Sequence, residues 1–149
     1  MSAVQLLATG LDYAPAAILD DLRITVVRTW LRDTWGVWSR DCQRIVIASG
    51  LSEVQERCVL AHELEHVYAD DAECSNPIAR IRQERGADLR AARKLVGISD
   101  LARVAQWAGD PHTAAAALHV TQRLLEVRLQ DLRGEGWPWR PLGGSRIAG

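Results

Sequence analysis

The sequence lacks the features that mark secreted, membrane and thiolate-based metal proteins. Its three cysteines, Cys42, Cys58 and Cys74, form an odd and widely spaced set without a CxxC pair. This argues against a disulfide framework and against a zinc site built from thiolates. No apolar run is long enough to cross a bilayer, and no charged-then-apolar signal segment opens the chain. We therefore expect a cytoplasmic protein.

The sequence also lacks an excess of either charge. The 18 basic and 19 acidic residues give a formal net charge of −1, so there is no general electrostatic signal for a nucleic-acid or membrane partner. A content of 48% hydrophobic and 25% charged residues is ordinary for a globular domain. We expect one domain over residues 1–135, long enough to bury a core, and a flexible Gly- and Pro-rich tail over residues 136–149.

The first third of the chain is expected to form a small sheet. Residues 1–20 are weakly patterned and fit either a short helix or a mobile lead-in. Residues 23–31, "RITVVRTWL", are rich in β-branched residues and indicate a strand. Residues 35–50 indicate two more strands around an Arg-Asp turn, of which "RIVIA" is the stronger. We predict an antiparallel sheet of about three strands.

Two helices with clear start signals follow. Ser52 and Gln55 form a capping box, and apolar residues at helical spacing predict a helix over residues 52–68. Asn76 as N-cap and Pro77 at the first helical position predict a second helix, which should end near Gly97. These two helices form the centre of the expected fold.

The last third, about residues 98–133, is expected to be helical. Ser99, Asp110 and Thr121 are each placed to cap a further helix. The link "ALHVT" resembles a helix-turn-helix corner, but the next helix carries Glu126 and Asp131 beside two arginines, too balanced for a phosphate-binding face. The predicted fold class is therefore α+β: a small N-terminal antiparallel sheet packed on the helix over residues 52–68, with a helical C-terminal half.

The stretch "RCVLAHELEHVYADD" contains the residues that indicate chemistry. His62 and His66 lie four residues apart, hence one turn apart on the same face of a helix, and can reach one metal ion together. Glu63 is rotated by about 100° from His62 and lies beside the metal, where a general base must stand. This is the H-E-x-x-H arrangement of zinc hydrolases.

A plainer interpretation explains the same letters. The motif has only three fixed positions, so two surface histidines on a charged helix also fit it. Two observations favour the metal site. The chain has only four histidines, and two of them are in the motif. The flanking "CVLA" and "VYA" are apolar, as a half-buried ligand helix requires.

A catalytic zinc site needs a third protein ligand and one open position. The elongated motif with a third histidine is excluded, because positions 69 and 72 are both alanine. The following helix offers "ERGAD", in which Glu84 can bind the metal and Asp88 can accept the free ring N–H of a ligand histidine. The small residues Gly86 and Ala87 would permit close approach of the two helices. Glu73 is the alternative third ligand.

The combination of "LAHELEHV" and a downstream "ExxAD" resembles the ImmA/IrrE-type metallopeptidases, which share thermolysin-like zinc chemistry. The resemblance covers roughly residues 22–132, including the lead-in "RIVIASGLSEVQERCVLAHELEH" and the ending "AAAALHVTQRLLEVRLQDL". It implies one zinc ion per chain. By this resemblance, His62, His66 and Glu84 are the metal ligands, Glu63 is the base and Asp88 supports a ligand histidine.

The chain departs from the pattern of that family at two places. Glu65 replaces a small glycine, and we expect it to narrow the cleft or to add negative charge near the metal. After the third ligand the family's "AN.FA" is replaced by "ADLRAA". Asp in place of Asn is a stronger acceptor for an imidazole N–H. Substrate preference is therefore expected to differ.

The sequence predicts a zinc metalloendopeptidase in which Glu63 takes a proton from the attacking water and passes it to the leaving amine. Candidates for the residue that stabilises the oxyanion are His112, His119 and Tyr68. The resemblance implies that the substrate is a helix-turn-helix repressor, cleaved to relieve repression in mobile-element induction or a stress response. The alternative is a non-catalytic zinc-containing module, an anti-repressor or toxin–antitoxin component. The intact Glu63 argues against it, and crowding by Glu65 argues for it.

Overall fold

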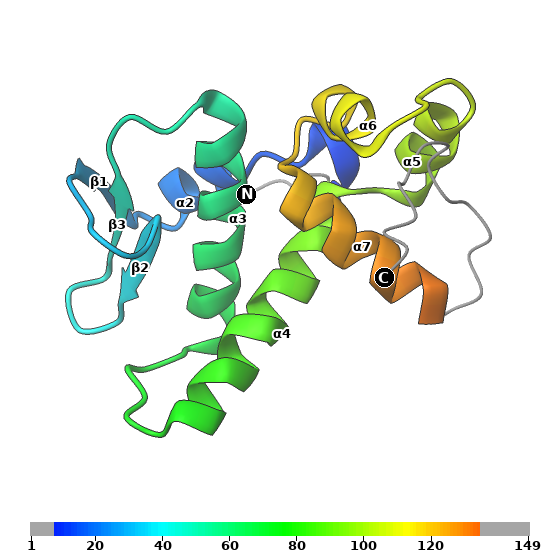
Figure 1. The fold of residues 1–149 in the computed structure, drawn as a ribbon. Helices are drawn as coiled ribbons and strands as arrows, with labels where there is room; N and C mark the ends of the chain where they lie inside the picture. The colour runs from blue at the N-terminus through cyan, green and yellow to red at the C-terminus, as the bar shows by residue number, and fades with distance from the viewer. Residues whose placement is uncertain (1–7, 135–149) are drawn as a thin grey trace.

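The computed structural model describes residues 8–134 (Figure 1). The expected tail over residues 136–149 lies outside the described residues. No helix in the described range is long and apolar enough to cross a membrane. The elements, in order, are η1 (Gly10–Asp12), α2 (Pro15–Asp21), β1 (Thr25–Thr29), β2 (Gly36–Ser39), β3 (Arg44–Ala48), α3 (Glu53–Ala69), α4 (Pro77–Leu95), α5 (Ile98–Ala105), α6 (Pro111–Ala117) and α7 (Gln122–Gly134).

The three strands form a mixed sheet in the order β1-β3-β2. β2 and β3 are antiparallel, as predicted, but β1 runs parallel to β3. The prediction of a wholly antiparallel sheet is therefore wrong for β1. The reason is the position of β3, whose Ile45 and Ile47 are fully buried. The most apolar strand takes the centre of the sheet, so β3 pairs with both β1 and β2. The chain reverses its direction once between β1 and β2 and again between β2 and β3, and β1 and β3 therefore run parallel.

Helix α3 lies between the sheet and α4, as Figure 1 shows. The buried side chains of β3 point from the sheet toward α3, and Arg28 of β1 forms an ion pair with Glu56 on the same side. Strand side chains alternate between the two faces of a sheet, so this single buried face fixes the register of the strands on α3. The α+β class with a helical C-terminal half is confirmed.

The start of α3 follows the predicted capping box. The Gln55 backbone N–H donates to Ser52 Oγ at 3.1 Å, and the Ser52 N–H donates to Gln55 Oε1 at 2.9 Å. These bonds satisfy two of the N–H groups that the first helical turn leaves without partners. The helix ends at Ala69, where Asp70 adopts a left-handed conformation with φ of 53°. This turn directs the chain back toward the helix.

Helix α4 starts as predicted, with Asn76 Oδ1 accepting the N–H of Ile78 at 2.9 Å and Pro77 at the first position. It ends at Leu95, near Gly97 as predicted. Gly97 has φ of −69° and not the left-handed conformation of many glycines after helices, and it is also the N-cap of α5. Because α5 begins at Ile98, Ser99 lies inside it and does not cap it.

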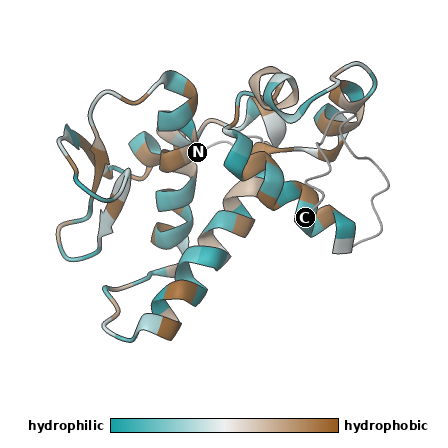
Figure 2. Cartoon of the chain, viewed as in Figure 1, coloured by the Kyte–Doolittle hydropathy of each residue, from teal (hydrophilic) through white to brown (hydrophobic). Residues whose placement is uncertain are grey.

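The helical C-terminal half packs against α3 and α4 around one continuous apolar core. Asp110 Oδ1 accepts the N–H of Thr113 at 2.8 Å and caps α6, and Thr121 Oγ1 accepts the N–H of Leu124 at 3.3 Å at the start of α7. Figure 2 shows teal and brown segments alternating along α4 and α7, as expected of helices with one buried face.

Candidate metal centre

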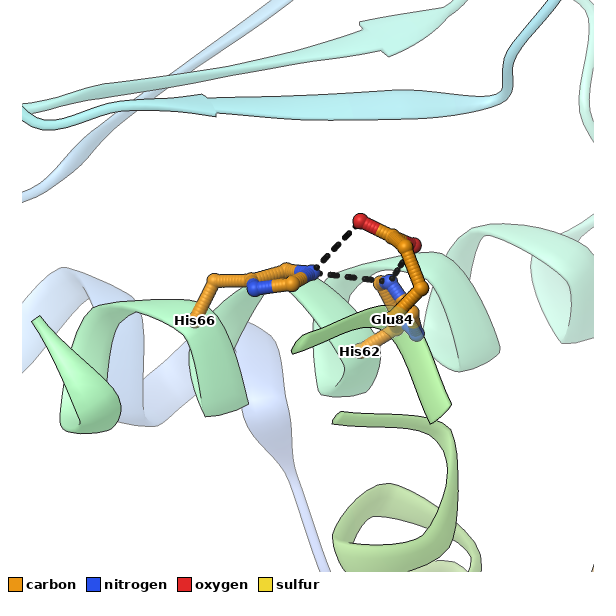
Figure 3. A group of neighbouring side chains, drawn as sticks. All are labelled: His62, His66 and Glu84. Atoms are coloured by element: carbon orange, nitrogen blue, oxygen red, sulfur yellow. Dashed lines mark hydrogen bonds and ion pairs between the residues drawn. The ribbon is translucent and has the colours of Figure 1, made fainter. Parts of the chain in front are cut away.

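Two neighbouring helices bring the predicted metal ligands together. His62 and His66 project from adjacent turns of α3, and Glu84 projects from α4 toward both rings (Figure 3). The contact face of α4 is made of small residues, since Ala87 and Ala91 are fully buried. Small side chains at a helix contact shorten the distance between the axes. A carboxylate on α4 can therefore reach imidazoles on α3.

The three ligand atoms are spaced as around one ion. Nε2 of His62 lies 3.1 Å from Nε2 of His66, and the two Glu84 oxygens lie 3.0 Å from His62 Nε2 and 3.2 Å from His66 Nε2. A tetrahedral zinc ion with bonds of about 2.0–2.1 Å separates its ligand atoms by about 3.3 Å. The 3.1 Å between the two nitrogens is close to this separation, and one ligand atom from each of the three residues lies within 4.8 Å of the others, so the group can hold one metal ion.

The hydrogen bonds of the two rings also fit a metal. Nδ1 of His62 lies 2.8 Å from Asp88 Oδ1, and Nδ1 of His66 lies 2.8 Å from Asp71 Oδ2. When each Nδ1–H donates to its carboxylate, each neutral ring turns an Nε2 lone pair toward Glu84. Three acceptors aimed at one point repel one another unless a proton or a metal ion lies between them. The donor set is therefore that of a cation site.

The charges of this cluster are strongly coupled. Burial disfavours the charged form of His62, but hydrogen bonds to Asp88 and Glu84 outweigh burial and raise its pKa to about 9. The same imidazoles hold the pKa of the Glu84 carboxyl well below its usual range. A proton and a metal ion thus compete for the same basic nitrogens, as expected for histidine ligands.

Glu63 lies beside this group on the side of the sheet. Its side chain is buried, and a Cβ at Gly36 of β2 would lie 2.8 Å from its Oε1. Glycine at position 36 therefore leaves room for the carboxylate under the strand. Burial raises the pKa of Glu63, while nearby His62 and His66 and a backbone hydrogen bond from Trp38 act in the opposite direction. A carboxylate with a raised pKa beside a metal group is suited to accept a proton.

The sequence analysis missed Asp71, the partner of His66. The left-handed turn at Asp70 brings Asp71 back over the end of α3, where its N–H donates to the His66 carbonyl at 3.0 Å. Gln83 of α4 donates to the other Asp71 oxygen at 3.2 Å. Two acids, Asp70 and Asp71, directly follow the helix in the sequence. The sequence does not show which of them folds back to contact His66. Glu73, the alternative third ligand, is not in the group of potential ligands assembled by the described residues.

The sequence analysis also missed Arg123, which binds the carboxylate that orients His62. Its two terminal nitrogens donate to the two Asp88 oxygens at 2.7 and 2.9 Å. These bonds join α7 to α4 beside the metal group. Nothing in the local sequence around position 123 indicates this contact, because it depends on how α7 crosses α4.

Glu65 was expected to narrow the cleft or to add negative charge near the metal, but its side chain points away from the potential ligands. Its side chain is buried toward α4, where Arg90 Nε lies 3.2 Å from Oε2 and the Lys94 ammonium pairs with Oε1 without a directed hydrogen bond. A Cβ at Gly86 would lie 2.8 Å from a terminal nitrogen of Arg90. Gly86 therefore gives space to the Arg90 side chain, and it is Ala87 that lies buried at the helix contact.

The suggested oxyanion-stabilising residues do not join the three potential ligands. His112 Nδ1 lies 2.9 Å from Gln122 Nε2, and the His119 carbonyl accepts a hydrogen bond from Arg57 at 2.8 Å. Tyr68 lies on the Glu65 side, with the Lys94 ammonium 4.5 Å from its ring centroid. The side-chain contacts of His112 and Tyr68 therefore lie elsewhere in the structure, and the contact at His119 is made by its backbone carbonyl.

One comparison with known proteins gives a match. The model of the Peptidase_M78 family, described as the IrrE N-terminal-like domain, matches residues 22–130. That range includes the sheet, α3, α4 and most of α7, and hence all three potential ligands. Comparison with curated proteins and with solved structures finds no match.

Proposed function

This chain belongs to the Peptidase_M78 family, and from that membership and the ligand geometry we propose that it is a zinc-dependent endopeptidase. The observation that carries the proposal is the convergence of His62 Nε2, His66 Nε2 and Glu84 on one point, with both Nδ1 atoms directed to carboxylates. Such a set holds a cation and leaves a fourth position for water or substrate.

The reaction assigned to the site is hydrolysis of a peptide bond. Zinc, when bound, lowers the pKa of water and polarises a carbonyl group. Glu63 accepts a proton from the attacking water at its carboxylate and passes it to the nitrogen of the leaving amine. Asp88 and Asp71 keep the rings of His62 and His66 in the tautomer that presents Nε2 to the metal.

We further propose that the substrate is a helix-turn-helix repressor and that cleavage occurs in the cytoplasm and relieves repression. The support for this substrate is the resemblance to ImmA/IrrE-type metallopeptidases. The near-neutral charge supports a protein substrate over nucleic acid, because the chain has no excess of basic residues for phosphate contacts.

The alternative is a zinc-containing module that binds a partner without cleaving it. The main support for it was the expectation that Glu65 crowds the cleft. The Glu65 carboxylate instead pairs with Arg90 and Lys94 at α4, so this support is removed. The buried Glu63 beside the ligands supports catalysis, since a purely structural site needs no base there.

The proposal is tested with the purified full-length chain. Elemental analysis should find about one zinc per chain, and Glu84→Ala should lose most of the zinc affinity. The zinc-loaded protein should cleave a helix-turn-helix repressor encoded beside its own gene. A chelator should stop this cleavage and added zinc should restore it. A protein that neither contains nor binds zinc would refute the proposal.

A further inference from the structure

Two arginine–aspartate pairs join α4 to α7. In one pair the arginine is on α7, and in the other it is on α4. Near the start of α7, Arg123 donates to both oxygens of Asp88 on α4 at 2.7 and 2.9 Å. Further along, Arg93 of α4 donates to both oxygens of Asp131 on α7 at 2.9 and 2.6 Å. Both pairs are bidentate, a geometry that fixes the plane of the carboxylate as well as its distance.

The two aspartates differ in their third partner. Asp88 Oδ1 also lies 2.8 Å from His62 Nδ1. Asp131 Oδ2 accepts a hydrogen bond from Arg128, whose Nε donates to the Val96 carbonyl at 3.1 Å. The first pair therefore reaches a potential metal ligand, whereas the second is connected to the helical core.

The start of α7 is also tied directly to the helix that carries His62. The Thr121 N–H points to Cys58 Sγ at 3.4 Å, and Cys58 lies one turn before His62 on the same face of α3. Arg57 of α3 donates to the carbonyl of His119, just before α7. Figure 1 shows α7 crossing α4 with its first turn toward α3. The "ALHVT" corner thus docks on the metal-ligand helix.

The bidentate bond determines how firmly Asp88 orients the ring. A carboxylate bound only by one imidazole N–H can still rotate about its side-chain bonds. The Arg123 fork fixes the carboxylate plane and so keeps Oδ1 in line with His62 Nδ1. Partners that orient a ligand histidine influence metal affinity, typically by ten- to a hundredfold.

We propose that Arg123 is a positioning residue for His62: it acts through Asp88, so that the C-terminal helices control how tightly the site binds zinc. This inference rests on the zinc site proposed above. It assigns to α7 a role in metal binding that is separate from its packing on α4. The Arg123 side chain is 64% exposed and still makes two short bonds to this one carboxylate, as a positioning role requires.

The experiment measures zinc affinity by competition with a chromophoric chelator, together with the thermal unfolding of each variant. We expect Arg123→Ala to lower zinc affinity about tenfold. The matched control is Arg93→Ala, which breaks the other bidentate pair between the same helices. This control should lose comparable thermal stability and keep its zinc affinity within about twofold. Arg123→Lys keeps the charge without the fork, so it should recover little of the affinity.

A double-mutant cycle tests whether Arg123 acts through Asp88. Asp88→Ala should lower zinc affinity about ten- to a hundredfold, and adding Arg123→Ala should then change it by less than about twofold. Equal zinc affinity in Arg123→Ala, Arg93→Ala and wild type would overturn the inference while leaving the zinc site intact. Equal losses in Arg123→Ala and Arg93→Ala, or additive losses in the cycle, would also overturn it. If Arg123→Ala does not fold, the zinc affinity of Arg123→Lys tests the inference in its place. A wild-type protein that binds no zinc would overturn both proposals.

Discussion

Glu63 and Glu65 are two buried carboxylates on the same helix, and they have different surroundings. Their exposed fractions are 4% and 2%. Two residues along a helix correspond to a rotation of about 200°, so the side chains point to opposite sides of α3. Glu63 faces β2 and the potential metal ligands, and Glu65 faces α4. One of the two carboxylates therefore lies beside the potential metal ligands, and the other lies at the contact between α3 and α4.

The difference lies in the partners. Glu65 is paired with two permanent cations, Arg90 and Lys94. Among the described residues, no Arg or Lys forms an ion pair with Glu63, whose charged neighbours are the two imidazoles and Glu84. A buried charge needs compensation, and Glu65 obtains it from side chains. Under the proposed function, a bound metal ion would compensate Glu63 and leave its carboxylate available for proton transfer.

The largest expected difference between the two positions is in activity. Glu63→Gln should lower kcat/KM for peptide hydrolysis about a thousandfold, because the amide cannot accept the proton of the attacking water. The isosteric Glu65→Gln should keep kcat/KM within about threefold. Both variants should retain zinc, checked by elemental analysis. A Glu63→Gln variant that still relieves repression in cells, without cleavage of the repressor, would establish the binding-module alternative instead.

Stability should show the reverse order. Glu65→Gln leaves two cations without their carboxylate and should lower the free energy of unfolding by about 1–3 kcal/mol. The value lies below that of a fully buried pair, because Arg90 and Lys94 are 43% and 35% exposed and can be hydrated. Glu63→Gln removes a buried charge that lacks such partners and should cost less. Urea unfolding of the metal-free proteins measures both, and an equal loss at the two positions would remove the distinction.

The signals that could be predicted from the sequence are local. The capping box at Ser52 and the Asn76–Pro77 start lie within four residues of the helices they begin, and the spacing of His62 and His66 places them on one face by helix geometry alone. The α+β class followed from the same local patterns. Each of these features is determined by neighbours in the sequence.

The features that escaped prediction depend on tertiary arrangement. The parallel pairing of β1 required knowledge that β3 takes the centre of the sheet. The sequence showed that Glu65 departs from the family pattern, but not that Arg90 and Lys94 would form ion pairs with it at α4. The bond from Arg123 to Asp88 joins residues 35 positions apart on two helices whose crossing no local pattern encodes.

The smallest expected effect concerns Tyr13, whose raised pKa has burial as its larger cause and the Glu65 charge as a smaller one. The Tyr13 hydroxyl is buried without a hydrogen-bond partner among residues 8–134. Burial raises its pKa well above the usual range, and the Glu65 charge raises it further. The unfolded chain releases this proton near pH 10 while the folded chain retains it, so the contribution to stability is complete below about pH 10 and is lost as pH rises above it.

Wild type should therefore lose up to about 1.4 kcal/mol of unfolding free energy per pH unit above pH 10 through Tyr13. Tyr13→Phe should remove this loss and change stability at pH 7 by less than about 1 kcal/mol, because no hydrogen bond is broken. Neither Glu65→Gln nor Glu63→Gln should change this loss between pH 8 and pH 11, because burial, the larger cause of the raised pKa, by itself keeps Tyr13 of the folded chain protonated there. Urea unfolding between pH 8 and pH 11 measures the four proteins. An alkaline loss that persists in Tyr13→Phe would show that other groups cause it and would refute the assignment to Tyr13.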